Sequence, residues 1–282
     1  MIKLNQPLAF GFSLRRHSLL RALLGLSLYA SSMQRLDLTF PTPAELLAAD
    51  EALLDWSEAG PGGETLWFWE PREIFVVVGY ANKIETEVNV RACAETGVPI
   101  FRRCSGGGTV VQMPGGLNYG LILRIAENGP TRNISATNAF VMEKNRAAAQ
   151  AALGTGNLEV AVRGHTDLAV KAPLAPPSAF LKVAGNSQRR RKHFLLFHGT
   201  FLLHCNLGLI SDLLPMPSQE PDYRAGRPHG EFVTNLNLAP GAVKSAMCRA
   251  WGADNRLAEP PLKEIERLAR EKYATRAWNH KF

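Results

Sequence analysis

The sequence predicts an α+β fold in which helices flank a mixed, mainly antiparallel sheet. Strand-like runs follow one another in adjacent groups, whereas a wound parallel sheet alternates strands with helices. Helix-like runs gather at the ends of the chain and between these groups. In addition, 46% of the 282 residues are hydrophobic and 20% are charged. This composition excludes disordered and collagen-like classes and is sufficient for a large core.

The first expected elements are a strand, a helix and two more strands. Residues 35–40 alternate apolar with polar side chains, as a half-buried strand does. Thr42 opens the run TPAE, a capping box with proline at the first helical position, so a helix is expected to begin there and to stop at Gly60. Residues 65–69 and 74–80 are rich in β-branched and aromatic side chains, which predicts two strands.

The middle of the chain is expected to contain a short helix at residues 88–96 and a strand at 98–101. This strand leads directly into the run RRCSGGGT at residues 102–109. Residues 109–111 and 117–125 are strand-like on either side of a Pro-Gly-Gly turn, and this pattern predicts a hairpin.

The second half of the chain has a similar mixture of elements. Four consecutive basic residues, Arg189 to Lys192, are expected to form a solvated turn. No internal repeat is visible, and the length allows one large domain or two small ones. The remaining expected elements are a helix at 138–153, strands at 158–162, 167–170 and 193–204, a proline-rich loop at 173–177, and helices at 241–251 and 261–273.

The net charge of +7 is unevenly distributed along the chain. Residues 1–36 contain five basic residues and no acidic one, so the remaining 246 residues carry 27 basic against 25 acidic groups. A nearly neutral body argues against a nucleic acid or a membrane as the partner. Residues 1–32 are interpreted as an N-terminal extension, either upstream sequence that is translated or a targeting segment, and are left out of the fold argument.

The four cysteines lie at irregular spacings and include no CxxC pair, so they indicate neither a disulfide framework nor a zinc site. Reduced thiols in a cytoplasmic protein are the simplest interpretation. The cysteines are Cys93, Cys104, Cys205 and Cys248.

The run RRCSGGGT is the densest chemical signal. Three consecutive glycines leave the backbone bare, so that a ligand can approach the N–H groups closely. Arg102 and Arg103 beside them could neutralise a phosphate. The run lacks the Gly-Lys-Ser/Thr ending of a P-loop and does not open a helix. Taken alone, a glycine triplet is more often a turn that connects two strands than an anion site.

Two later segments carry further polar residues among apolar ones. Lys182 lies in the run LKVAGNSQ, where a lysine either snorkels to solvent or points into a site. His198 lies in the apolar run FHGTF, and a histidine in such a strand is more often structural than catalytic. Asp167 is compatible with a turn carboxylate or a site residue. No Ser-His-Asp signature or metal-ligand helix is present in these runs.

The order of these segments resembles the lipoate–protein ligases of the biotin/lipoate protein ligase superfamily. The matching pieces are RRxSGGG, a Leu-Asn-Tyr strand, Asp-Leu, Lys-x-x-Gly-x-x-Gln and His-Gly-Thr, and the resemblance covers residues 35–282. It implies a catalytic fold related to class II synthetases. It also implies that ATP and Mg²⁺ activate lipoate or octanoate as acyl-AMP, and that a lysine of a lipoyl carrier domain then accepts the acyl group.

The resemblance also assigns roles to residues. Lys182 matches the family lysine that stabilises charge on the acyl carbonyl and phosphate oxygens. Asp167 matches a position near the adenylate and Mg²⁺, or one that orients the incoming amine; the other metal ligands are not identified. The chain departs from the family pattern at Gln112, which replaces a histidine, and at Gly116, which replaces an asparagine. The expected adenylate- and ATP-binding residues are Arg103, Ser105, Gly106, Gly107, Gly108, Thr109, Asn118, Asp167, Gly185, Gly199 and Thr200.

Two other functions remain open. Octanoyltransferases and lipoyl amidotransferases of the same superfamily pass the acyl group through a cysteine thioester, but residues 164–168 contain no thiol. Cys104 and Cys205 lie in other segments. A non-catalytic protein that binds an acyl group or a lipoyl domain is the third possibility, which the departures at Gln112 and Gly116 suggest.

The implied partner is a lipoyl carrier domain of the 2-oxoacid dehydrogenase E2 type or the glycine cleavage H protein type. Many family members have an accessory domain after the catalytic one. The resemblance implies that residues 33–282 are a single catalytic domain, and this chain is expected to have no accessory domain. We therefore expect it to work alone, to recruit a separate accessory polypeptide, or to perform one half-reaction.

Overall fold

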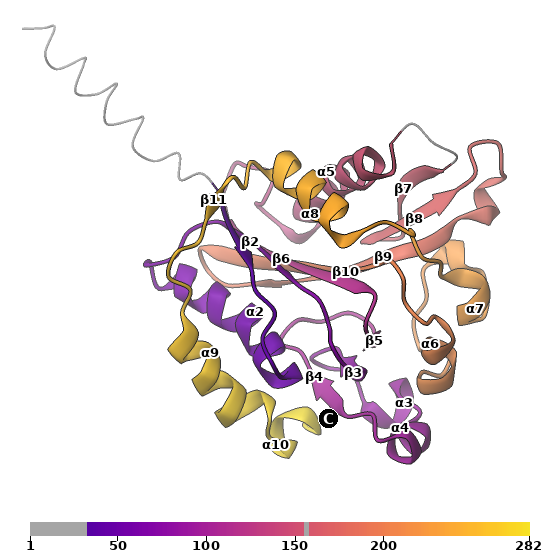
Figure 1. Ribbon diagram of the computed structural model, residues 1–282, viewed down its shortest axis with the longest axis horizontal. Helices are drawn as coiled ribbons and strands as arrows, with labels where there is room; N and C mark the ends of the chain where they lie inside the picture. Colours follow the sequence, from indigo (N-terminus) through magenta and orange to yellow (C-terminus); the bar gives the residue numbers. More distant parts are fainter. Residues whose placement is uncertain (1–32, 155–157) are drawn as a thin grey trace, which may run out of the picture. The chain divides into compact units, whose positions relative to one another are not determined.

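The computed structural model describes residues 33–154 and 158–282, so the expected N-terminal extension lies outside the described residues. Two sheets form the framework, and the larger one crosses the view of Figure 1. Its strands lie in the order β11-β1-β2-β6-β10-β9-β8-β7, and only the β11–β1 and β1–β2 pairs are parallel. The strands are β1 (Gln34–Asp37), β2 (Thr65–Trp69), β6 (Gly116–Arg124), β7 (Glu159–Arg163), β8 (Asp167–Lys171), β9 (Leu181–Arg190), β10 (Phe194–Leu202) and β11 (Asn255–Arg256).

The smaller sheet has the order β4-β3-β5, with β3–β4 parallel and β3–β5 antiparallel. Its strands are β3 (Phe75–Val78), β4 (Ile100–Arg102) and β5 (Val110–Gln112). A mixed, mainly antiparallel sheet with flanking helices is the predicted fold class, and the structure confirms it.

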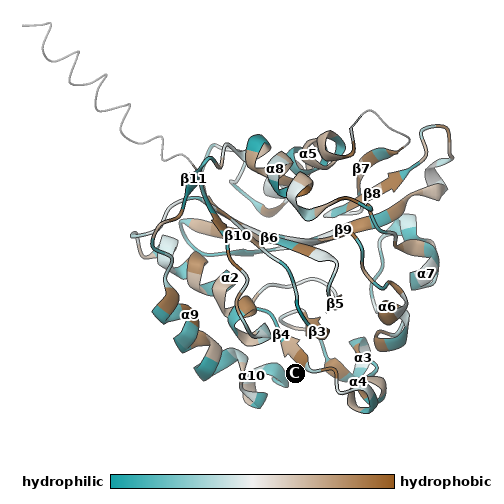
Figure 2. Ribbon diagram, in the orientation of Figure 1, coloured by the Kyte–Doolittle hydropathy of each residue, from teal (hydrophilic) through white to brown (hydrophobic). Residues whose placement is uncertain are grey.

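Helices cover both faces of the large sheet (Figure 1). The helices α5 (Ile134–Leu153) and α8 (Pro240–Trp251) lie on one face, and α2 (Pro43–Glu58) lies on the other, where α9 (Leu262–Leu268) packs against it. Figure 2 shows hydrophilic and hydrophobic residues alternating around α2 and α9, as expected of helices with one buried side. The shorter helices are α3 (Ile84–Glu87), α4 (Val90–Thr96), α6 (Gly208–Leu213), α7 (His229–Phe232) and α10 (Arg276–Asn279).

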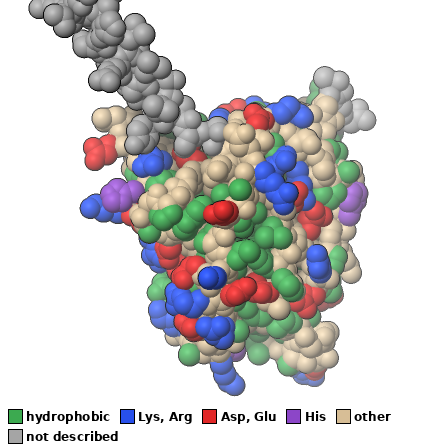
Figure 3. Space-filling model, turned by 60° about the vertical axis from the view of Figure 1, so that its left-hand side comes forward, with side chains coloured by type: hydrophobic (Ala, Val, Ile, Leu, Met, Phe, Trp, Pro, Cys, Tyr) green, Lys and Arg blue, Asp and Glu red, His purple; other side chains and the backbone are tan. Residues whose placement is uncertain are grey.

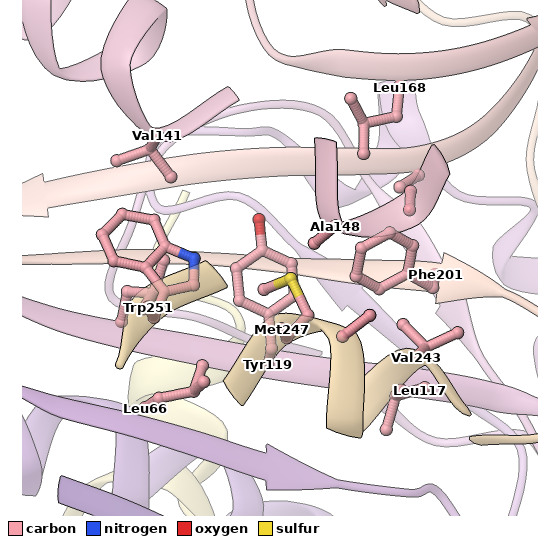
Figure 4. Packing of buried hydrophobic residues seen from close by; sticks show 14 of the residues in the cluster. Leu66, Leu117, Tyr119, Val141, Ala148, Leu168, Phe201, Val243, Met247 and Trp251 are labelled. Carbon is pink, nitrogen blue, oxygen red and sulfur yellow. The ribbon is translucent and has the colours of Figure 1, made fainter. Parts of the chain in front are cut away.

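The apolar core on the α5/α8 face is continuous. Tyr119 of β6 and Phe201 of β10 lie with their ring centroids 5.6 Å apart, beneath Met247 and Trp251 of α8 (Figure 4). All four side chains are buried. Burial of several large side chains against one face of the sheet is the main source of stability on this side.

The predicted capping box opens α2. The Thr42 hydroxyl accepts a hydrogen bond from the Glu45 amide, and the Glu45 carboxylate accepts one from the Thr42 amide. The helix begins at Pro43 and ends at Glu58, so the prediction from residue 42 is confirmed. Helix α5 begins earlier than predicted, at Ile134, because the Asn133 side chain caps the Ala136 amide.

The hairpin predicted around the Pro-Gly-Gly turn is wrong. Strand β5 pairs with β3 in the small sheet, whereas β6 pairs with β2 and β10 in the large one. The Gly115 carbonyl accepts hydrogen bonds from the amides of Leu203 and His204, at the end of β10. Gly115 has a φ of 90°, and a Cβ there would lie 2.4 Å from the His204 oxygen. A contact with a distant segment therefore directs the chain from one sheet to the other.

The basic run Arg189–Lys192 is only partly a turn, which corrects the prediction. Arg189 and Arg190 belong to β9, a strand that the sequence did not predict because glycine, asparagine and serine are depleted in strands. Their guanidinium groups donate to the carbonyl oxygens of Cys104 (2.7 Å) and Thr131 (2.8 Å). Pairing with β8 and β10 on both sides stabilises this strand despite its composition.

The face shown in Figure 3 carries Lys and Arg side chains interspersed with Asp and Glu. Oppositely charged side chains form ion pairs, such as Lys244 with Asp37 and Glu70, and Arg267 with Glu264. Within residues 33–154 and 158–282, no helix is long and apolar enough to cross a membrane.

Candidate active site

Four of the predicted site residues meet in one row across the large sheet, on the face turned toward α2. Asn118 of β6 pairs with Thr200 of β10, Thr200 pairs with Gly185 of β9, and Gly185 pairs with Asp167 of β8. Directly paired residues of adjacent strands share a face. Segments that are up to 82 residues apart in the sequence are therefore side by side.

Lys182 reaches this row from the same strand as Gly185. Its Nζ lies 2.8 Å from Asp167 Oδ1. A Cβ at residue 185 would lie 2.9 Å from the Lys182 Nζ and Cε atoms, so the glycine leaves room for the side chain to lie across the strand. The Lys182 side chain is 29% exposed and Asp167 12%, so the ammonium is held by a carboxylate and still accessible to a ligand.

Asp167 has a second partner, which sequence reasoning missed. The Tyr223 hydroxyl donates to Asp167 Oδ2 at 3.0 Å from a short turn at Asp222–Arg224. The two carboxylate oxygens are thus divided between an ammonium and a phenol. Burial and the adjacent Asp167 charge raise the pKa of Tyr223, so the phenol remains a donor. No motif marks this residue, because the contact is made by a distant loop.

The glycine run forms an exposed loop held from below by Arg103. Its guanidinium donates to the carbonyl oxygens of Gly106 (2.5 Å) and Gly108 (2.7 Å) and is itself buried. Gly107 has a φ of 83°, a conformation that favours glycine. The Ser187 hydroxyl donates to the Gly106 carbonyl at 2.9 Å. The expected contact of Arg103 with an adenylate stays a prediction, while its contact with the loop is direct.

Arg102 is not at the site, which corrects the assignment of both arginines to an anion. It is fully buried, and its Nη1 donates to the carbonyl oxygens of Gly79, Tyr80 and Asn82. Its Nε donates to the Asn279 carbonyl. Arg102 therefore connects three chain segments, and the neighbouring arginine alone faces the glycine loop.

A second set of polar contacts links three segments behind the loop. His198 Nδ1 lies 2.6 Å from Asp50 Oδ2, and His198 Nε2 lies 2.6 Å from Ser105 Oγ. Ser105 Oγ also accepts from Arg103 Nε at 3.0 Å. Sequence analysis singled out Ser105 and His198 separately. The helix segment that begins with Asp50 also fits the family resemblance, but the sequence assigned Asp50 no role in the site.

Gln112, the first departure from the family pattern, is fully hydrogen-bonded. It exchanges two hydrogen bonds with the Asn118 amide, at 2.8 and 2.9 Å, and donates a third to Thr200 Oγ1 at 3.0 Å. The Thr200 hydroxyl donates to Asn118 Oδ1. This buried cluster joins β5 of the small sheet to β6 and β10 of the large one, and none of its members titrates near neutral pH.

The remaining predicted residues have distinct places. Gly199 lies on the opposite face, where a Cβ would come within 1.7 Å of Asn186 Oδ1, so its absence of a side chain makes room for the protein itself. Gly116, the second departure, begins β6 beside Cys205. The Thr109 hydroxyl at the end of the glycine loop is buried and has no hydrogen-bond partner within the described residues.

All four cysteines are free and buried. Burial raises the pKa of Cys104 to about 12 and that of Cys205 to about 11. A thiol nucleophile acts as the thiolate, which burial disfavours. In the part of the chain that the structure describes, no group of three or more Asp, Glu, His or Cys side chains could hold a metal ion.

Comparisons with known proteins agree with the fold. A model of the lipoyl protein ligase A/B catalytic domain matches residues 42–247. Octanoyltransferase LipM of Anoxybacillus flavithermus is 27% identical over 271 residues, which cover 85% of this chain and 95% of that protein. Octanoyltransferase LipM of Geobacillus kaustophilus is 26% identical, with 87% and 97% covered.

Two solved structures show the same architecture. A bi-partite lipoate protein ligase from Thermoplasma acidophilum, studied with its E2 lipoyl domain, has a TM-score of 0.68 and 24% identity, over 88% of this chain and 96% of that one. Lipoate-protein ligase A bound with ATP has a TM-score of 0.65 and 22% identity, over 88% and 97%. At these identities the likeness establishes the fold.

Proposed function

The chain belongs to the lipoyl protein ligase A/B catalytic domain family, and on this premise we propose that it attaches an octanoyl or lipoyl group to a lysine of a lipoyl carrier domain in an ATP-dependent reaction. The membership confirms the resemblance found in the sequence and makes the protein an enzyme of the lipoate ligase and octanoyltransferase superfamily. The choice between these two activities is the proposed part.

One observation favours the ligase reaction. Lys182 and Asp167 form a partly exposed ion pair, whereas all four cysteines of the chain are buried. A reaction through an enzyme thioester needs a thiolate within reach of the acyl donor. Activation of the carboxylate by ATP needs no such nucleophile, only positioning and stabilisation of charge.

The proposed roles follow from charge and accessibility. The Lys182 ammonium stabilises negative charge that develops on the acyl carbonyl or α-phosphate oxygens. Asp167 holds that ammonium in place, and Tyr223 holds Asp167. The glycines at residues 106–108 are exposed and carry no side chains of their own, so their backbone offers a close approach to an anionic ligand.

The residues present are compatible with ATP and Mg²⁺. Bound ATP would supply the phosphate that activates the carboxylate. Mg²⁺ commonly binds to one or two carboxylates together with substrate phosphates rather than to an all-protein cage. Asp167 is the carboxylate of the row across the large sheet. A magnesium ion that binds together with the nucleotide would need only this one carboxylate, so it is compatible with described residues that contain no larger acidic cluster.

Direct octanoyl transfer from a thioester donor is the second candidate, because the curated relatives named above are octanoyltransferases. The partner in either case is proposed to be a lipoyl carrier domain. Because the similar Thermoplasma ligase is bi-partite, a separate accessory polypeptide is proposed as a second partner of this chain.

The two candidates are separated by the acyl donor. The purified chain is incubated with a lipoyl domain and either octanoate with ATP and Mg²⁺ or an octanoyl thioester without ATP, and the mass of the domain is measured. Each mixture is repeated with a Cys205→Ser variant as a control. We expect acylation only with octanoate and ATP, at the same rate in the variant. Acylation from the thioester alone, or from free octanoate without ATP, would overturn the ligase proposal.

A further inference from the structure

A chain of hydrogen bonds joins helix α2 to the glycine loop through strand β10. Its members are Arg103, Ser105, His198 and Asp50, and its links measure 3.0, 2.6 and 2.6 Å in that order. We infer that this chain is a relay that positions the glycine loop, so that Asp50 and His198 are positioning residues that act on bound substrate only through Ser105 and the loop. The effect on catalysis rests on the proposed function.

The relay is continuous from the helix to the arginine. The Asp50 carboxylate accepts from His198 Nδ1, because a carboxylate has no donor. The other ring nitrogen shares a hydrogen bond with Ser105 Oγ, which also accepts the Arg103 Nε–H. Hydrogen bonds in a chain polarise each other, so the loss of one link weakens the others.

The relay also connects two buried charges. Asp50 is 3% exposed and Arg103 is 7% exposed. Burial lowers the pKa of Arg103 to about 10, and the negative charge of Asp50 is among the influences that oppose this shift. A buried charge costs free energy unless it is paired or hydrogen-bonded. The relay connects the negative charge of Asp50 with the positive charge of Arg103, so each charge reduces the cost of burying the other.

Neighbouring residues leave space for this arrangement. Gly120 of β6 pairs with His198, and a Cβ on it would lie 3.2 Å from Asp50 Oδ1. On the other side, His198 pairs with Ser187, whose hydroxyl donates to the Gly106 carbonyl. His198 therefore lies between a glycine that leaves room for the Asp50 carboxylate and a serine that contacts the loop.

The consequence for the loop follows from the second set of bonds that Arg103 makes. The guanidinium that donates to Ser105 through Nε also donates to the carbonyl oxygens of Gly106 and Gly108. A change at Asp50 is thus transmitted to the loop backbone, although the carboxylate touches no loop atom. The Tyr80 amide donates to the Ser105 carbonyl at 2.8 Å and reports on the position of the loop.

The test compares two Asp→Asn changes on the same helix. Asp50→Asn removes the charge at the end of the relay with little change in shape. Asp55→Asn is the matched control, because Asp55 is paired with Arg191 outside the relay. Hydrogen exchange of a peptide containing the Tyr80 amide is measured in the substrate-free protein. We expect exchange at least about tenfold faster in Asp50→Asn than in the control, since a hydrogen bond to a charged group has been lost.

Kinetics supply a second readout, with His198→Gln as a further variant in case Asp50→Asn does not fold. Gln can replace the contact to Ser105 but not both contacts of the ring, so His198→Gln should retain more activity than His198→Ala. In Asp50→Asn and His198→Gln, we expect KM for the acyl substrate or ATP to rise by a larger factor than kcat falls. The control variant Asp55→Asn should keep the Tm of the parent chain. Unchanged Tyr80 exchange in Asp50→Asn and His198→Gln, or an equal change in Asp55→Asn, would overturn the relay. Because exchange needs no substrate, failure of the proposed function leaves this test decisive.

Discussion

The two faces of the large sheet are built from the same strands and do different things. On β10, Phe197 and Phe201 point toward α5 and α8 and are fully buried in the continuous core, whereas His198 and Thr200 between them point to the other face and form polar contacts. Because successive side chains of a strand point to opposite faces, residues that stabilise the core and residues that form the polar contacts lie close together in the sequence of β10. In this part of β10, changes at Phe197 or Phe201 should mainly alter the free energy of unfolding, and changes at His198 or Thr200 should mainly alter activity. The separation is local, because Phe194 and Leu196, earlier in β10, are buried in the apolar core on the α2 side.

The largest expected effect tests the apolar face. Phe201→Ala removes a fully buried ring that packs on Tyr119 and should lower the free energy of unfolding by about 3–5 kcal/mol. Urea unfolding measures the loss, and the activity per folded molecule should stay close to that of the parent chain. A large fall in kcat at a temperature where the variant is folded would show that the two faces are not separate.

Lys182→Ala tests the polar face. Removal of the ammonium should reduce kcat/KM for lipoyl-domain acylation by roughly 10²–10³-fold, because charge developing in the transition state loses its partner. The side chain is 29% exposed, so the Tm should change little. Lys171→Ala, on the adjacent strand and paired with Glu159, is the matched control. Equal acylation by Lys182→Ala and the parent would show that the mechanism assigned to Lys182 is wrong.

The pH dependence of stability should also come from the polar side, through Glu51 of α2. Burial acts to raise the pKa of Glu51, but Lys272 and Tyr273 hydrogen-bond the carboxylate and, together with Arg189, bring its pKa below the ordinary value of 4.5. Because the folded-state pKa is the lower one, this stabilisation is present above pH 4.5 and is lost as the pH falls below it.

Glu51→Gln measures this contribution. The variant should be less stable than the parent by about 2 kcal/mol at neutral pH. The difference should shrink as urea unfolding is repeated down to about pH 3. Glu95→Gln, a change in an exposed pair with Arg91, should leave the free energy of unfolding nearly unchanged at every pH. A stability difference that stays constant with pH would exclude the carboxylate as its source.

The smallest expected effect falls on the neighbour of Phe201. Thr200→Val keeps the shape of the side chain and removes the hydroxyl that joins Gln112 and Asn118. The amide pair remains, so the free energy of unfolding should fall by only about 1 kcal/mol. Activity should fall by a larger factor than that in Phe201→Ala, when both are measured per folded molecule. The reverse order would contradict the separation of the two faces.

Much of the fold was readable from local patterns. The Thr42 capping box places α2, the β-branched runs place β2 and β3, and the order of motifs identified the family. The hairpin prediction failed because the contact of Gly115 with the end of β10 is non-local. Strand β9 was missed because its stability comes from two neighbouring strands rather than from the propensity of its glycine, asparagine and serine residues.

For the site, the sequence by itself determined which residue types are available: an accessible lysine, a glycine loop and no thiol near the Asp-Leu segment. Only the tertiary structure decided how they are used. Strand register places Asp167 beside Lys182, and packing of a distant turn brings Tyr223 to the other carboxylate oxygen. Arg102 points away from the site, whereas Arg103 supports the glycine loop. Register and loop packing depend on contacts between segments far apart in the chain, and local sequence does not encode those distances.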